Sequence, residues 1–175
     1  MKITGAMLAI GLASVLAAGA ATAQTKQVDK DSQKFITTAI EGDIAEINVG
    51  QLAQEKSQNE AVKQYGAMLV KDHGDHKAKA EAVASEIGVK PPTGSSMGEK
   101  ATYAKLKVLS GATFDRSFAK SMVSDHQADI KEYQKESGKS DPVGQLAKAT
   151  LPTLQKHLKA AQDLEKQTAQ KQSSR

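Results

Sequence analysis

Apolar residues recur at alternating spacings of three and four along most of this chain. That spacing places them on one face of a helix, which can then pack against other helices. The pattern predicts four long helices and one short one, over residues 31–54, 57–87, 100–109, 114–136 and 141–166. We therefore expect an all-α fold, an up-down four-helix bundle with the short extra helix between helices two and three.

Local signals set the expected helix ends. Ser57 and Glu60 have the spacing of a capping box for the second helix, and Gly88 follows its last turn as a glycine cap. Thr113 can cap the third helix, and Asp141, which directly precedes a proline, can cap the fourth.

Polar residues interrupt the apolar stripes at a few positions. The chain has four histidines, and all of them fall on core-facing rows: His73, His76, His126 and His157. Glu46 likewise lies on the apolar stripe of the first helix. Burying such groups costs free energy unless each is hydrogen-bonded or bound to a metal.

A shared metal site is the first interpretation of these residues. Imidazoles with a carboxylate suit iron, zinc or copper better than calcium or magnesium. The predicted ligands of one transition-metal ion are Glu46, His73, His76, His126 and His157. Nearby carboxylates would orient the imidazoles from behind, and the candidates are Asp72, Asp125 and Asp129. Two alternatives stay open: a metal-free polar layer that sets helix register, and a salt bridge between Glu46 and a lysine.

The first 23 residues have the pattern of a signal peptide. Lys2 precedes an apolar run over residues 6–20, and Ala21-Thr22-Ala23 matches the small-x-small cleavage site. The run is too short for a comfortable membrane anchor. We expect an exported protein of the periplasm, or a secreted one, that does not span the membrane after cleavage. The predicted organisation is a signal peptide (1–23), a flexible lead-in (24–30), the bundle domain (31–166) and a polar tail (167–175).

Composition narrows the remaining chemistry. The chain has no cysteine, so neither a disulfide nor a thiolate is available. The net charge of +4 comes from lysines that alternate with acids, which indicates a solvated surface rather than a nucleic-acid site. No glycine-rich phosphate loop or nucleophile elbow is present in the sequence, so an enzyme of conventional type is the least favoured class. The sequence names no protein partner and no oligomeric state.

Several segments carry a family resemblance. MLVKDHGDH, GATFDRSFAKSMVSDH and LPTLQKHL resemble the bacterial domain of unknown function 4142 family, over about Lys34 to Leu164. The resemblance implies an exported, ferritin-like four-helix bundle, with a metal site by analogy only. Ferritin-like di-iron sites use Glu-x-x-His pairs, yet His73 stands three residues before His76 and Leu154 three before His157. A single histidine-rich ion, or a vestigial site with hydrogen-bonded histidines, therefore fits better than a di-iron centre.

Two functions follow as hypotheses. The first is an exported bundle that binds a transition-metal ion, in metal handling or protection of the envelope against stress. The alternative is a metal-free structural or interaction module of the cell envelope, whose buried polar layer sets the helix register.

Overall fold

The computed structural model describes residues 28–173, with side chains for residues 28–170. This part of the chain forms five α-helices and no strand, which confirms the all-α prediction. The helices are α1 (Lys30–Lys56), α2 (Glu60–Glu86), α3 (Met97–Lys107), α4 (Gly111–Glu136) and α5 (Pro142–Ser173). Within the described range, no helix has both the length and the apolar character needed to cross a membrane. The predicted signal peptide and most of the lead-in lie outside the described residues.

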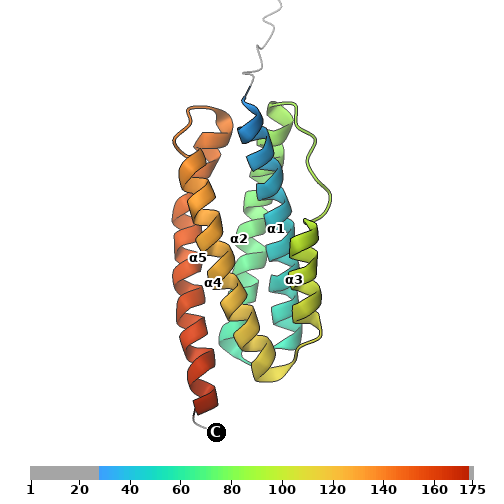
Figure 1. Ribbon diagram of the computed structural model, residues 1–175, viewed down its shortest axis with the longest axis vertical. Helices are drawn as coiled ribbons and strands as arrows, with labels where there is room; N and C mark the ends of the chain where they lie inside the picture. The colour runs from blue at the N-terminus through green and yellow to red at the C-terminus, as the bar shows by residue number, and fades with distance from the viewer. Residues whose placement is uncertain (1–27, 174–175) are drawn as a thin grey trace, which may run out of the picture.

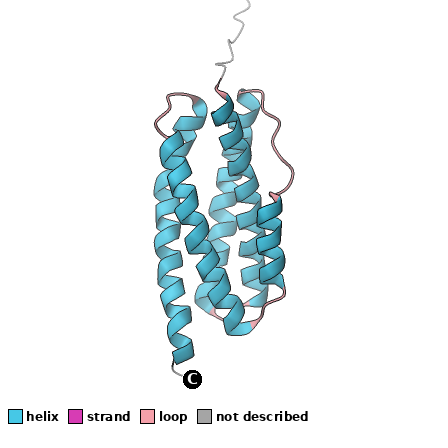
Figure 2. Cartoon of the chain, viewed as in Figure 1, coloured by secondary structure: helices cyan, strands magenta, loops and turns pink. Residues whose placement is uncertain are grey.

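The long helices pack in pairs. α1 lies along α2 and α4 lies along α5, each pair as an antiparallel hairpin (Figure 1). Contacts of α2 with α5 and of α1 with α4 join the hairpins, and the short α3 lies against α1 (Figure 1). Figure 2 shows the loops gathered at the helix ends, apart from the longer loop from α2 to α3. The core therefore lies between the helix pairs.

The start of α2 corrects one prediction. The helix is capped by Asn59, whose side chain accepts a hydrogen bond from the N–H of Ala61 at 3.2 Å. Ser57 instead ends α1, and its hydroxyl donates to Asp115 of α4 at 2.6 Å. The predicted capping box was wrong because the Ser57 hydroxyl binds α4 and does not cap α2. Gly88 does end α2 as predicted, with a φ of 75°.

Helices α3 and α4 both begin earlier than predicted. A capping box of Ser96 and Glu99, which the sequence analysis missed, starts α3. α4 begins at Gly111, where a φ of 54° lets the chain turn into the helix. Thr113 therefore lies inside the first turn, and its predicted role as the cap was wrong.

Helix α5 begins as predicted and ends later. The Asp141 carboxylate accepts from the N–H of Gly144 at 2.8 Å, as a capping residue does. The helix continues to Ser173, whereas the sequence suggested a polar tail from residue 167. Thr168 explains part of the extension, because it is buried and its hydroxyl donates to the carbonyl of Leu164 at 3.0 Å.

A close contact between α1 and α2 sets the spacing of this pair. A Cβ atom on Gly50 would lie 2.7 Å from the Gly66 carbonyl oxygen, and one on Gly66 would lie 2.5 Å from that of Gly50. Glycine is needed at both positions because any side chain would push the backbones apart. Asp43 and His73 lie two turns away on the same rows of these helices, so the glycine contact also brings them together.

The polar residues form a layer between apolar clusters. The larger cluster fills the end of the molecule where α1 turns into α2, and smaller clusters fill the other end. The layer between them takes residues at one level from all four long helices: Asp43, Glu46, His73, His76, His126 and His157. All four histidines are at most 9% exposed, which confirms that they face the core.

Candidate metal centre

Asp43 holds two of the histidines. Its Oδ1 accepts a hydrogen bond from Nδ1 of His73 at 2.9 Å, and its Oδ2 accepts from Nδ1 of His76 at 2.7 Å. A carboxylate can only accept, so each Nδ1 carries the hydrogen. Both Nε2 atoms are buried without a hydrogen-bond partner, and each has a lone pair when its ring carries no second hydrogen.

The sequence analysis missed Asp43. The apolar stripe expected on this helix included Gly42, whereas the buried row has Asp43 at that level. That row has a regular alternation of four and three: Ser32, Ile36, Ala39, Asp43, Glu46, Gly50 and Ala53. This alternation is the signal in the sequence that could have identified Asp43.

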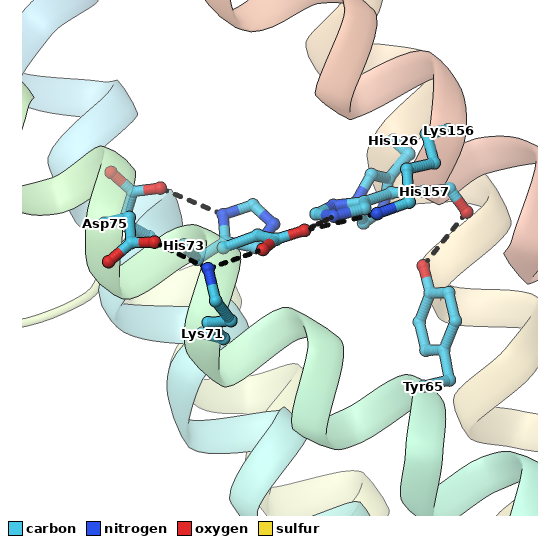
Figure 3. Close-up of polar contacts among 9 residues, drawn as sticks. Tyr65, Lys71, His73, Asp75, His126, Lys156 and His157 are labelled. Carbon is cyan, nitrogen blue, oxygen red and sulfur yellow. Dashed lines mark hydrogen bonds and ion pairs between the residues drawn. The ribbon is translucent and has the colours of Figure 1, made fainter.

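His126 and His157 form a chain of contacts across α4 and α5. Nδ1 of His126 donates to the Met122 carbonyl at 2.9 Å, and Nε2 of His157 lies 3.0 Å from Oδ2 of Asp72. Between the rings, Nε2 of His126 lies 3.3 Å from Nδ1 of His157. Figure 3 shows these two rings side by side.

Both rings are electrically neutral near pH 7. Burial, with His73 and His157 as neighbours, lowers the pKa of His126 to about 3. Burial also lowers the pKa of His157, although the hydrogen bond with Asp72 opposes the shift.

Two neutral rings carry only two ring hydrogens for three contacts. The Met122 carbonyl takes the hydrogen of His126, and the Asp72 carboxylate takes that of His157. The contact between the rings is then left with two facing lone pairs. A metal ion bound by both nitrogens would remove the repulsion between these lone pairs.

His73 completes a cluster with this pair. The ligand nitrogens of His73, His126 and His157 all lie within 4.8 Å of one another. The ring centroid of His73 lies 5.8 Å from that of His126 and 5.3 Å from that of His157. Figure 3 shows the His73 ring directed towards the other two. Three lone pairs thus converge from three helices, and we call these residues the histidine triad.

The second nitrogen of each triad ring is fixed by an oxygen. Asp43 holds His73, the Met122 carbonyl holds His126, and Asp72 holds His157. Metal-binding histidines commonly have such partners, which set the tautomer and orient the ring. Asp72 is one of the carboxylates predicted to orient an imidazole, and it makes its hydrogen bond with His157.

Asp72 joins the triad to the molecular surface. Burial alone would raise its pKa, but the hydrogen bond with His157 and the nearby lysines lower it overall. Lys71 and Lys156 lie 3.6 Å and 3.8 Å from its carboxylate oxygens. Asp72 stays ionised and can balance positive charge at the triad.

The remaining predicted site residues lie outside the triad. His76 lines a cavity of 320 Å³ together with Asp129 and Tyr133. Glu46 forms no salt bridge with a lysine in the described part of the chain. Asp125 and Asp129 make no hydrogen bond with an imidazole there, and their charges act with burial to raise the pKa of Glu46.

Comparison with known proteins places this arrangement in a family. A family model described as a domain of unknown function, DUF4142, matches residues 17–164. The chain belongs to the DUF4142 family. A search of curated proteins gave no match to this DUF4142 protein.

A solved structure shares its fold. It is the crystal structure of a DUF305 fragment from Deinococcus radiodurans, with a TM-score of 0.71 and 16% sequence identity. The match covers 79% of this chain and 97% of that chain. At this identity the likeness to the DUF4142 protein concerns the fold alone.

Proposed function

We propose that the protein binds one transition-metal ion through His73, His126 and His157. The observation that carries this proposal is that the ligand nitrogens of these three buried histidines all lie within 4.8 Å of one another. Iron, zinc and copper all take neutral imidazole ligands. The scaffold would be the up-down, ferritin-like four-helix bundle in which such sites form between facing helices.

The spacing of the nitrogens suits a metal ion. Two nitrogens bound to zinc at about 2.0–2.1 Å in tetrahedral geometry are about 3.3 Å apart. The His126 and His157 nitrogens have this separation. Three histidines leave a fourth position for water or another ligand, as in open metal sites.

We place this role in the cell envelope. The support is the positively charged start, the apolar run and the small-x-small site in residues 1–23. Metal handling or protection against metal stress fits a site that combines buried imidazoles with a carboxylate, Asp72, towards the surface. The absence of a nucleophile or phosphate loop from the sequence favours binding over conventional catalysis.

A matched pair of variants tests the triad. His73 and His76 both donate a hydrogen bond from Nδ1 to Asp43, but only His73 belongs to the triad. We expect His73→Asn to lose stoichiometric Zn²⁺ or Cu²⁺ binding in calorimetric titration, and His76→Asn to keep it. Equal affinity in both variants would contradict the assignment.

Elemental analysis and thermal melting complete the test. Protein purified from its native compartment should carry about one equivalent of one transition metal, and removal of the metal should lower its Tm.

The contact between His126 and His157 also favours a second function, a metal-free module with a structural polar layer. A shared proton would satisfy the two facing nitrogens without any metal. This alternative predicts that a chelator leaves the Tm unchanged and that His126→Leu is tolerated or stabilising. The melting and metal-content measurements therefore separate the two functions.

A further inference from the structure

A cavity of 320 Å³ lies beside the histidine triad and is lined by residues from both helical hairpins and from α3. His73 and His157 form part of its wall. We propose that this cavity binds a small organic ammonium ion, whose apolar body packs on an aromatic wall and whose charged group binds Asp129 and His76. This site does not depend on metal binding by the triad.

The size and one wall of the cavity suit an organic ligand. Pockets for small molecules have volumes of about 300–1,000 Å³, far more than a single metal ion needs. One part of the wall is apolar and belongs to a packed cluster: Phe35, Ala39, Tyr133 and Leu154. The rings of Phe35 and Tyr133 meet edge to face with their centroids 4.8 Å apart. Aromatic rings can pack against an apolar body, and their faces attract organic cations.

His76 supplies the observation that points to a ligand. The residue lines the cavity and is only 9% exposed, and its Nε2 is buried without a hydrogen-bond partner. Its Nδ1 donates to Asp43 at 2.7 Å, so Nε2, at the other edge of the ring, points away from that carboxylate. When the ring carries no second hydrogen, Nε2 can accept a hydrogen bond from an N–H of a ligand. Such a bond would remove the cost of burying this nitrogen without a partner.

Asp129 supplies a negative charge at the same cavity. Its side chain is half-buried and lines the cavity, and it forms no hydrogen bond or ion pair with another residue in the described range. Burial, with the charges of Asp125, Asp43 and Glu99, raises the pKa of Asp129 to about 7. A positive charge beside this carboxylate would oppose that shift and stabilise the ionised form.

The charges around the cavity favour a cation over an anion. The lysines that line it, Lys34 and Lys135, are both exposed, so they lie at its rim. Among the described residues, the buried and half-buried part of the wall has carboxylates but no lysine or arginine. A bound anion would therefore lie near Asp129 and Glu99 without a basic side chain to balance it.

Three ligands of one shape test the charge preference. Benzylammonium, benzyl alcohol and benzoate share an aromatic ring and differ in charge. Each is titrated calorimetrically into the full chain, freed of metal, at pH 8, where Asp129 is ionised and benzylammonium keeps its charge. We expect about one equivalent of benzylammonium to bind, and the other two to bind at least tenfold more weakly. No binding of benzylammonium, or equally tight binding of either of the others, would overturn the proposal.

Two variants of the polar wall test the residues. Asp129→Asn removes the charge, and His76→Asn removes Nε2 while its amide can still donate to Asp43. Each should weaken benzylammonium binding at least tenfold in a protein whose melting shows that it is folded. Asp163→Asn is the matched control, because Asp163 is an exposed acid on α5 that does not line the cavity. Unchanged affinity in both variants, or an equal loss in the control, would overturn the assignment.

A cavity-filling variant tests the location without a change of charge. Gly42 lines the cavity, and the nearest atom to an added Cβ would be Oε1 of Glu99 at 3.8 Å. Gly42→Leu therefore has room for its side chain and should occupy the space of the ligand. We expect it to bind benzylammonium at least tenfold more weakly. Unchanged affinity in the folded variant would place the ligand elsewhere and overturn the proposal.

Zn²⁺ titration of the same proteins distinguishes this proposal from the metal site. Asp129→Asn and His76→Asn should lose benzylammonium affinity and keep Zn²⁺ binding, because neither residue belongs to the triad. A parallel loss of both ligands in these variants would overturn the proposal of a separate site.

Discussion

Two levels of the α1–α2 hairpin are built on the same helix rows but by different means. Near the turn, Gly50 and Gly66 bring the backbones together, and an apolar cluster fills the space around them. Two turns away on those rows, Asp43 and His73 meet through a hydrogen bond. Apolar packing depends mainly on volume and buried area, whereas the polar layer depends on the partner of every single atom.

This difference teaches where function can arise in a helical bundle. The side chains of the apolar end pack against one another and require no hydrogen-bond partner. The polar layer differs, because Nε2 of His73, Nε2 of His76 and an oxygen of Glu46 are buried without a hydrogen-bond partner. Unsatisfied atoms of this kind are where an ion can bind.

The largest expected effect comes from breaking the apolar end. Phe118 is fully buried there, with its ring 5.9 Å from that of Tyr65. Phe118→Ala should lower the free energy of unfolding by about 3–5 kcal/mol, because it leaves a cavity. Urea denaturation measures this change, and Val108→Ala is a control at a residue that is 83% exposed. Similar losses in both variants would mean that Phe118 is not part of the core.

The glycine contact gives the next effect. Gly66→Ala should destabilise the protein by about 1–3 kcal/mol, since the new methyl group would meet the Gly50 carbonyl. Gly74 lies in the same helix with nothing within 4 Å of an added Cβ atom. Gly74→Ala should therefore stabilise it by about 0.5–1 kcal/mol, as expected for alanine in a helix. The opposite signs are measurable by urea denaturation, and equal signs would contradict the close approach.

Asp43 tests the polar layer. Asp43→Asn replaces one acceptor oxygen by an N–H₂ group, so one of the two imidazoles must change tautomer or lose its hydrogen bond. We expect a loss of about 1–3 kcal/mol in stability and of about 10–100-fold in Zn²⁺ affinity. The control is Asp75→Asn, which removes only a surface pair with Lys71 and should change stability by less than about 0.5 kcal/mol. Unchanged metal affinity in Asp43→Asn would contradict a role of Asp43 in metal binding.

The smallest effect is a dependence on pH in the metal-free protein. Burial and neighbouring charges raise the pKa of Asp129 to about 7, above the 3.8 of an unperturbed Asp. The folded state therefore binds more protons between about pH 4 and 7, and the Asp129 contribution to stability falls as the pH rises through this range. The charged groups that act on Asp129 are Asp43, Glu99 and Asp125, which raise its pKa, and His76, which lowers it.

Asp129→Asn isolates this contribution. Its Tm relative to the wild type should increase between pH 4 and pH 8, with chelator present in both samples. His126, whose pKa is lowered to about 3, makes both proteins less stable as the pH falls from about 6.5, so its effect cancels in the comparison. A constant difference in Tm would show that Asp129 is not protonated in the folded state.

The sequence predicted the helices and their buried faces well, because hydrophobic periodicity determines both. The helix ends were less certain, since Ser57 could cap α2 or bind α4, and only the packed structure decides. The histidines were identified as buried and Asp72 as a candidate partner, but Asp43 was not identified. Which ring meets Asp43 and which meets Asp72 depends on rotamers and on the approach of separate helices.

The most direct measurement of the central claim is the position of the metal itself. Crystals grown with Zn²⁺ and measured at the zinc absorption edge would show where the ion binds by its anomalous scattering. The account predicts a peak about 2.0–2.1 Å from nitrogens of His73, His126 and His157. No peak at the triad, with Nε2 of His126 still in contact with Nδ1 of His157, would contradict it.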